Sequence, residues 1–76
     1  MTVSWIEESI FSQAEHLEGL VQRRLGNRVR DFRLVVRNNG VILQGRASTY
    51  HAKQLAQHAA MELVPMPILA NDIEVR

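Results

Sequence analysis

The chain begins with apolar residues spaced for a helix. Between residues 5 and 25 they recur every three or four positions, which is typical of a helix that buries one face. Ser4 and Glu7 form a capping box at its start, and Gly26 suits the residue after a helix. The pattern therefore predicts a helix over residues 5–25. Its apolar stripe comprises Ile6, Ile10, Ala14, Leu17, Leu20, Val21 and Leu25.

Strand-like residues follow over residues 29–47, on either side of Asn39-Gly40. This dipeptide tolerates the two positive φ angles of a type I′ turn, so the stretch predicts a β-hairpin. If Asn38 and Val41 flank the turn, one face of the hairpin is almost wholly apolar. The cross-strand pairs on that inner face are then Val36 with Leu43, Leu34 with Gly45, and Phe32 with Ala47.

The outer face of the predicted hairpin is mostly polar. In the same register Arg33 lies across from Arg46, and like charges that face each other across a strand pair are destabilising. A compensating anion is therefore expected nearby. The outer residues are Arg33, Val35 and Arg37 on the first strand and Ile42, Gln44 and Arg46 on the second.

A second helix is predicted over residues 49–63, with Ser48 as a candidate N-cap. One face of this helix carries small and apolar residues at helical spacing. Four of them are alanines, so the helix backbone can approach the sheet closely, and Gly45 on the inner face leaves room for it. The residues of the face are Ala52, Leu55, Ala56, Ala59, Ala60 and Leu63.

Pro65 and Pro67 end this helix, because each lacks an amide donor and disfavours helix in the residue before it. The alternation over residues 69–75 then predicts a third strand. Asn71 interrupts its apolar face, which indicates a bulge or a side-chain hydrogen bond to the backbone. The alternation places Leu69, Ile73 and Val75 on one face and Asp72 and Glu74 on the other.

These elements give the order α-β-β-α-β. Two amphipathic helices need a surface to cover, and the inner face of the hairpin supplies it. The prediction is a single α+β domain over residues 1–76, in which two helices pack on one face of a three-stranded sheet. The residue pattern leaves open whether the third strand pairs with the second strand or the first.

Composition narrows the class of protein. The chain has 76 residues and no cysteine, so it has neither disulfides nor thiolate metal ligands. No segment has the roughly 18 apolar residues of a membrane span, and the N-terminus lacks the basic region of a secretory signal. We therefore expect a cytoplasmic protein, or a periplasmic one if the sequence is a trimmed mature form.

The formal net charge of +1 hides an uneven distribution along the chain. Counting Lys and Arg against Asp and Glu gives −4 for residues 1–18, +7 for residues 19–60 and −2 for residues 61–76. The basic middle and the acidic ends either neutralise each other in the fold or leave a patch that faces an anion.

Residues that could support catalysis do not form a recognisable motif. His16, His51 and His58 are the histidines, and none has the spacing of a metal-binding pair. On a helix, His51 and His58 would lie about 10 Å apart, which is too far to share a metal. No glycine-rich phosphate loop occurs. We expect a protein that is not an enzyme and that uses no metal or cofactor.

The arginines of the outer face are the candidate ligand-binding residues: Arg33, Arg37 and Arg46, with Lys53 as a fourth. Two readings stay open. Asp72 and Glu74 on the third strand neutralise the arginines, or the arginines bind an anion such as a lipid headgroup or a nucleic-acid phosphate. Nucleic acid ranks lower, because this face has no aromatic residue for base stacking.

The candidate interaction surface consists of Val35, Ile42 and Gln44, of which the first two are apolar on the outer side of the sheet. Trp5, Phe11 and Met61 also lie off the main apolar stripes. Exposed together, Val35 and Ile42 would suit a protein partner or homo-oligomerisation.

The hairpin and the segments after it resemble the BON domain, a module named for bacterial osmotically inducible and nodulation proteins. The resemblance implies a stand-alone copy of an α-β-β-α-β fold with a mixed sheet, in which the third strand lies beside and parallel to the second. It also implies a non-enzymatic module that binds other proteins or phospholipid surfaces. The matching residues are Phe32-Arg-Leu-Val-Val, Asn39-Gly40, Val41-x-Leu43-x-Gly45, Ala56, Ala59/Ala60 and Leu69-x-Asn71-x-Ile73-x-Val75.

Overall fold

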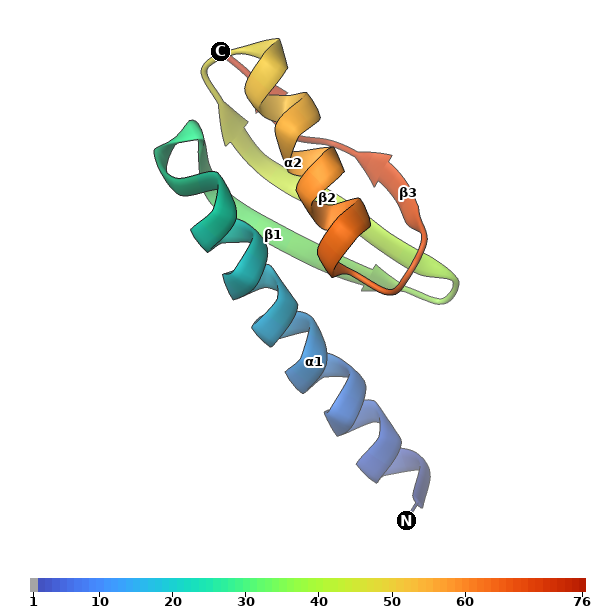
Figure 1. Cartoon of the computed structure of the whole chain (residues 1–76). Helices are drawn as coiled ribbons and strands as arrows, with labels where there is room; N and C mark the ends of the chain where they lie inside the picture. The colour runs from blue at the N-terminus through green and yellow to red at the C-terminus, as the bar shows by residue number, and fades with distance from the viewer. Residues whose placement is uncertain (1) are drawn as a thin grey trace.

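A computed structural model describes residues 2–76, with side chains from Gln13 onward, and shows the predicted α+β fold (Figure 1). The first helix, α1 (Thr2–Leu25), begins three residues earlier than predicted, so Ser4 lies inside the helix and is not its N-cap. The side chains of Trp5, Ile6, Ile10 and Phe11 lie outside the described side chains. A short 3₁₀ turn, η1, connects the first helix to the first strand. The elements are α1 (Thr2–Leu25), η1 (Gly26–Arg28), β1 (Val29–Arg37), β2 (Gly40–Ala47), α2 (Tyr50–Leu63), β3 (Ile68–Asn71) and β4 (Glu74–Val75).

The sheet is mixed. β1 and β2 form an antiparallel hairpin, and both β3 and β4 run parallel to β2 on its other side. β3 and β4 therefore lie end to end along β2 and occupy one strand position. The sequence pattern did not decide which strand the third strand pairs with, and the structure shows that it pairs with the second strand, β2. Both helices lie on the same face of the sheet (Figure 1).

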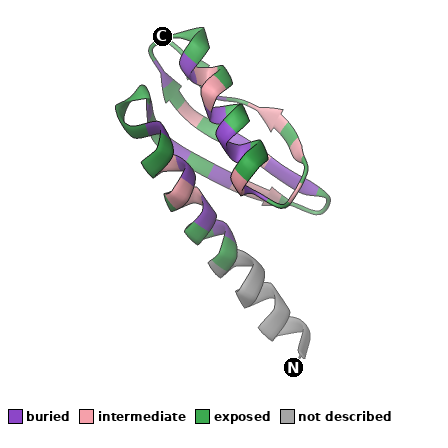
Figure 2. Cartoon of the chain, viewed as in Figure 1, coloured by how far each residue is buried: buried purple, intermediate pink, exposed green. Residues whose placement is uncertain are grey.

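The core lies between this face and the two helices (Figure 2). The predicted stripes are confirmed where the structure describes them: Val21 and Leu25 of α1 and Ala56 and Ala60 of α2 are buried. From the sheet, Leu43 is fully enclosed by these helix residues. The apolar inner face of the hairpin is therefore ordinary core.

The predicted turn of the hairpin is wrong by one residue, and the predicted register is therefore wrong by two. The turn residues are Asn38 and Asn39, and Gly40 is already the first residue of β2, paired with Arg37. Neither turn residue has a positive φ, so the turn is not type I′. The shift preserves the faces, because side chains alternate with a period of two, but it changes the pairs. The inner pairs are Val36 with Val41 and Leu34 with Leu43.

Gly40 serves another purpose than turn formation. A Cβ at this position would overlap the carbonyl oxygen of Pro67 and lie 2.9 Å from Cγ of Leu69. The amide of Val41 donates to that same Pro67 oxygen at 2.9 Å. Gly40 thus allows the chain before β3 to approach the start of β2.

β1 contains a bulge between Arg30 and Arg33, where the register with β2 shifts by one residue. Asp31 adopts a positive φ of 54°, which aspartate tolerates better than most residues. The extra residue allows Val29 and Phe32, which are three positions apart, both to point into the core. Regular alternation would have placed Arg30 there instead.

Gly45 lies opposite this bulge with φ of +152°. A Cβ there would lie 3.0 Å from the carbonyl oxygen of Arg30 and 3.1 Å from Cγ1 of Val29. The expectation that Gly45 makes room for the second helix is therefore wrong, because the space is taken by β1.

α1 binds the outer edge of β1 through polar side chains. The amide side chain of Gln22 accepts from the backbone N–H of Phe32 at 3.0 Å and donates to the carbonyl of Val29 at 2.8 Å. Glu18 accepts from the N–H of Leu34 at 2.8 Å. Three backbone groups at a strand edge are thus satisfied by a helix instead of by another strand.

α2 begins one residue later than predicted, and its N-cap is Thr49 and not Ser48. The Thr49 hydroxyl accepts from the amide of Ala52 at 3.0 Å, which satisfies one of the free donors of the first turn. Pro65 follows closely after the helix ends, as expected.

The predicted faces of the last strand are partly wrong. β3 has an extra residue at Leu69, since Val41 pairs with Ile68 while Ile42 pairs with Ala70. Leu69 therefore lies on the outer side over Gly40 and is 43% exposed, whereas Ile73 is buried. Asn71 makes the expected side-chain bond to the backbone: it donates to the carbonyl of Lys53 at 3.0 Å and accepts from the amide of Ile73 at 3.2 Å.

Three glycine-to-alanine substitutions test these close approaches. Gly45→Ala should lower the free energy of unfolding by about 1–3 kcal/mol, because it adds strain at a positive φ. Gly40→Ala should cost more, because its methyl group meets backbone. Gly19→Ala is the control: nothing lies within 4 Å of a Cβ on this exposed helical residue, so it should stabilise by about 0.5–1 kcal/mol. Urea denaturation measures all three, and a neutral Gly45→Ala would contradict the bulge.

The edge bonds of β1 give a second prediction. Gln22→Ala leaves the amide of Phe32 and the carbonyl of Val29 without partners, so it should destabilise by about 1–3 kcal/mol. It should also accelerate hydrogen exchange at the Phe32 amide. Gln54→Ala, on the exposed side of α2, is the matched control and should change stability by less than about 0.5 kcal/mol. Equal losses in the two variants would show that the edge bonds contribute nothing specific.

Candidate functional site

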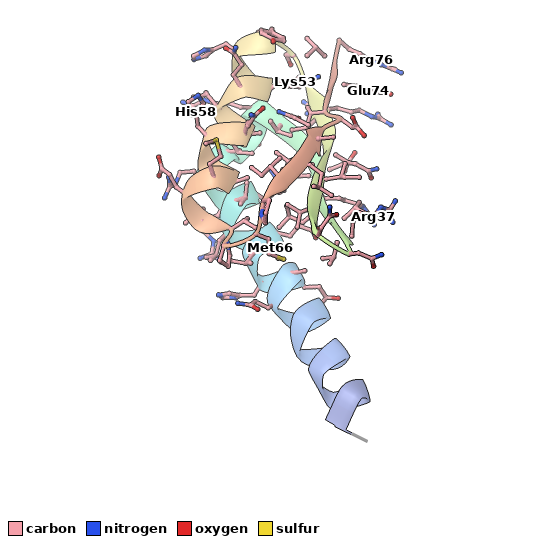
Figure 3. All side chains as sticks on the ribbon, turned by 90° about the vertical axis from the view of Figure 1, so that its right-hand side faces the viewer. Arg37, Lys53, His58, Met66, Glu74 and Arg76 are labelled. Carbon is pink, nitrogen blue, oxygen red and sulfur yellow. The ribbon has the colours of Figure 1, made fainter. Side chains whose placement is uncertain are left out.

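The outer face of the sheet carries no helix, and we call it the open face (Figure 1). Figure 3 views the sheet from its β3 side: Arg37, Glu74 and Arg76 project from this face, and His58 projects from α2 on the opposite side. The open face is defined by the outward residues of the four strands. They are Arg30, Arg33, Val35 and Arg37 of β1, Gly40, Ile42, Gln44 and Arg46 of β2, Leu69 and Ala70 of β3, and Glu74 of β4, with Asp72 between β3 and β4.

Apolar residues cross the open face near the hairpin turn. Val35 pairs with Ile42, and Ile42 pairs with Ala70, so one residue from each of the three strand positions forms a continuous row. All three are half-buried by their neighbours. Leu69 extends the row over Gly40, where its side chain is exposed. Val35 and Ile42 lie on the outer face as predicted, and the structure pairs them directly where the predicted register did not; β3 enlarges the row.

The arginines lie on the open face but not in the predicted pairs. Arg33 faces Gln44, and the residue across from Arg46 is Arg30. The expectation that Arg33 lies opposite Arg46 is wrong, because the hairpin turn is one residue earlier, which moves each cross-strand partner by two residues. The bulge between Arg30 and Arg33 then shifts the register by one more residue and brings Arg30 opposite Arg46. A like-charged pair still exists, formed by Arg30 instead of Arg33.

Carboxylates share the end of this face that is remote from the hairpin turn with Arg33 and Arg46. Glu74 is the β4 neighbour of Arg46, and Asp72 follows the β3 residue that pairs with Leu43. Asp31, Arg33, Gln44, Gly45, Arg46, Asp72 and Glu74 line one shallow hollow of about 360 Å³.

Among the described side chains, the arginines of β1 and β2 form no ion pair with these carboxylates. Within residues 13–76, Arg33, Arg37 and Arg46 make no salt bridge, and Glu74 instead contacts Arg76 at 3.3 Å. Acidic and basic groups are therefore close on one face without direct contact, and the arginine side chains remain available to a partner.

Lys53 is not brought to this surface. It belongs to α2, on the covered side of the sheet, and its carbonyl accepts the hydrogen bond from Asn71. Of the predicted ligand-binding residues, the structure brings three arginines to one face and leaves the lysine apart from them. Gln44, in the predicted interaction surface, lies between the apolar row and the charged hollow.

Leu69 and Arg30 are the open-face residues that alternation placed on the inner face, whereas Ala70 lies on the same face as Asp72 and Glu74, as alternation requires. For Leu69 the sequence contains a signal, since Ile68, Leu69 and Ala70 are three consecutive residues without a polar side chain. Adjacent residues in a regular strand point to opposite faces, so such a run places at least one apolar side chain on each face.

A larger hollow, of about 630 Å³, lies where α1 ends and α2 begins. Two of its polar side chains, Arg24 and Thr49, already have structural roles. Arg24 forms an ion pair with Glu62 at 2.8 Å, and the Thr49 hydroxyl caps α2. This hollow therefore offers less for recognition than the open face.

The histidines are dispersed. His16, His51 and His58 are each exposed, on two helices. Across the part of the chain with described side chains, no three His, Asp or Glu residues are grouped so that they could hold a metal ion.

Comparison with known proteins gives no further assignment. No family model, curated protein or solved structure matches the chain. Over the described residues, neither helix is both long enough and apolar enough to cross a membrane.

Proposed function

We propose that this chain is a non-catalytic protein-binding module and that the open face is its contact surface. The observation that carries the proposal is the apolar row of Val35, Ile42, Ala70 and Leu69 on a sheet face that no helix covers. An uncovered face of a sheet is ordinarily polar, because it faces water. A contiguous apolar row flanked by charges is instead the usual composition of a protein contact.

A second candidate is peripheral binding to anionic phospholipid. The three arginines without ion pairs favour it, since guanidinium groups bind phosphate in a bidentate way. Asp72 and Glu74 on the same face oppose it, because an anionic surface would approach these carboxylates as closely as the arginines. We therefore favour a protein partner.

Site-specific photocrosslinking tests the proposal. With p-benzoylphenylalanine in place of Ile42, illumination in an extract of the source cells should give protein adducts that excess unlabelled chain suppresses. An excess of an Ile42→Lys competitor should not suppress them. The same probe in place of Met61, which is exposed on α2, is the matched control and should give no competable adduct. No competable adduct at position 42 would overturn the proposal.

Vesicle sedimentation tests the lipid candidate. We expect equal, low sedimentation with anionic and with neutral vesicles, because the open face carries carboxylates beside its arginines. If the chain sediments with anionic vesicles at low salt, and Arg33→Gln/Arg37→Gln abolishes this, phospholipid and not protein is the ligand of the open face.

A further inference from the structure

We propose that the open face binds a second copy of this chain, face to face, with the two β2 strands over each other and parallel. This inference rests on the proposed function and names the partner. It follows from how charge is distributed among the strand positions of the open face.

The two sides of the open face carry opposite charge. The outward residues of β1 include Arg30, Arg33 and Arg37, and Asp31 lines the same hollow as Arg33. The β3–β4 side carries Asp72 and Glu74, with Arg76 in an ion pair with Glu74 at 3.3 Å, so its net charge is negative. The register sets these charges at matching levels along β2. Arg33 and Asp72 lie on either side of Gln44, and Arg30 and Glu74 lie on either side of Arg46.

A two-fold axis parallel to β2 uses this arrangement. Rotation about an axis midway between two packed sheets places β1 of one copy over β3–β4 of the other, at the same level. Arg33 then faces Asp72 of the second copy, and Arg30 faces Glu74 of the second copy. Each contact occurs twice. Facing sheets pack about 10 Å apart, a distance that an arginine and a carboxylate span together.

The apolar row matches itself under the same operation. Ile42 on the central strand faces Ile42 of the second copy, and Val35 faces Ala70 of the second copy. Leu69 meets the aliphatic part of Arg37. The contact therefore has an apolar centre and charged sides, as protein interfaces commonly do.

The alternative two-fold orientation is disfavoured by charge. An axis across the strands would place β1 over β1 and β3–β4 over β3–β4. Arginines would then face arginines, and carboxylates would face carboxylates, which costs binding free energy. Electrostatics thus selects the parallel arrangement.

The size of the face predicts weak association. With eight residues in β2 and three strand positions, the face covers about 26 Å by 14 Å, or about 360 Å² in projection. Stable interfaces bury about 800 Å² on each partner. We therefore expect dimers to appear only in the range of about ten micromolar to one millimolar.

Arg46 gives the proposal a distinctive consequence. It lies on β2 and so faces Arg46 of the second copy, beside Glu74 of its own chain. Replacing it with glutamine removes a repulsion. Arg46→Gln should therefore tighten the dimer, whereas Arg33→Gln should weaken it.

Sedimentation velocity over this concentration range tests the dimer. Arg33→Asp and Asp72→Arg should each raise the dimer dissociation constant by about tenfold or more, because each reversal creates two like-charged contacts. The double variant Arg33→Asp/Asp72→Arg should restore the wild-type constant. Arg28→Asp, with the same charge change on η1 away from the open face, should leave it unchanged. Circular dichroism verifies that each variant is folded.

Two results would overturn the inference. One is a wild-type chain that stays monomeric up to one millimolar, and the other is a dimer that the Arg33 and Asp72 substitutions do not alter. In either case, competable adducts at position 42 with other proteins would leave the proposed binding function intact. Absence of those adducts as well would remove both.

Discussion

The packing of this domain depends on one extra residue in β1, accommodated opposite Gly45. Asp31 adopts the positive φ. Because of the extra residue, the side chain of Val29 points into the core, as that of Phe32 does. The same step aims the carbonyl of Val29 and the amide of Phe32 at Gln22. A local irregularity in one strand thus sets where α1 contacts the edge of the sheet.

The buried faces of the helices and most of those of the hairpin were predictable from the sequence, whereas the cross-strand pairs and the face of Leu69 were not. The face to which a strand residue points alternates along the chain, and shifting the cross-strand register by two residues leaves every side chain on the same face. The position of the turn depends on Gly40, whose small size is needed for Pro67 and Leu69, distant in the sequence. The turn preference of Asn39-Gly40 could not reveal the contact of Gly40 with Pro67 and Leu69. The bulge did have a local signal, the three-residue spacing of Val29 and Phe32.

The candidate surface needed topology as well as pattern. Alternation identified Val35, Ile42 and the arginines of the hairpin, but the neighbours of Ile42 and Arg46 follow from where β3 and β4 pair. Lys53 was misplaced because its helix covers the other side of the sheet. The separation of charge between the two sides of the open face is therefore a property of strand order, which the pattern of residues alone left undecided.

The hydrogen bonds from α1 to the edge of β1 also limit how a sheet of this kind can grow. An open sheet polymerises when each copy offers two edges, since every added strand exposes another. Here Glu18 and Gln22 occupy backbone groups of the β1 edge. Among the side chains that the structure describes, no helix side chain binds the backbone of the β3–β4 edge in this way. Two copies that joined at that edge would end in a helix-bound strand on each side. Glu18 and Gln22, which bind α1 to the sheet, thus also block strand-by-strand growth into fibres at the β1 edge.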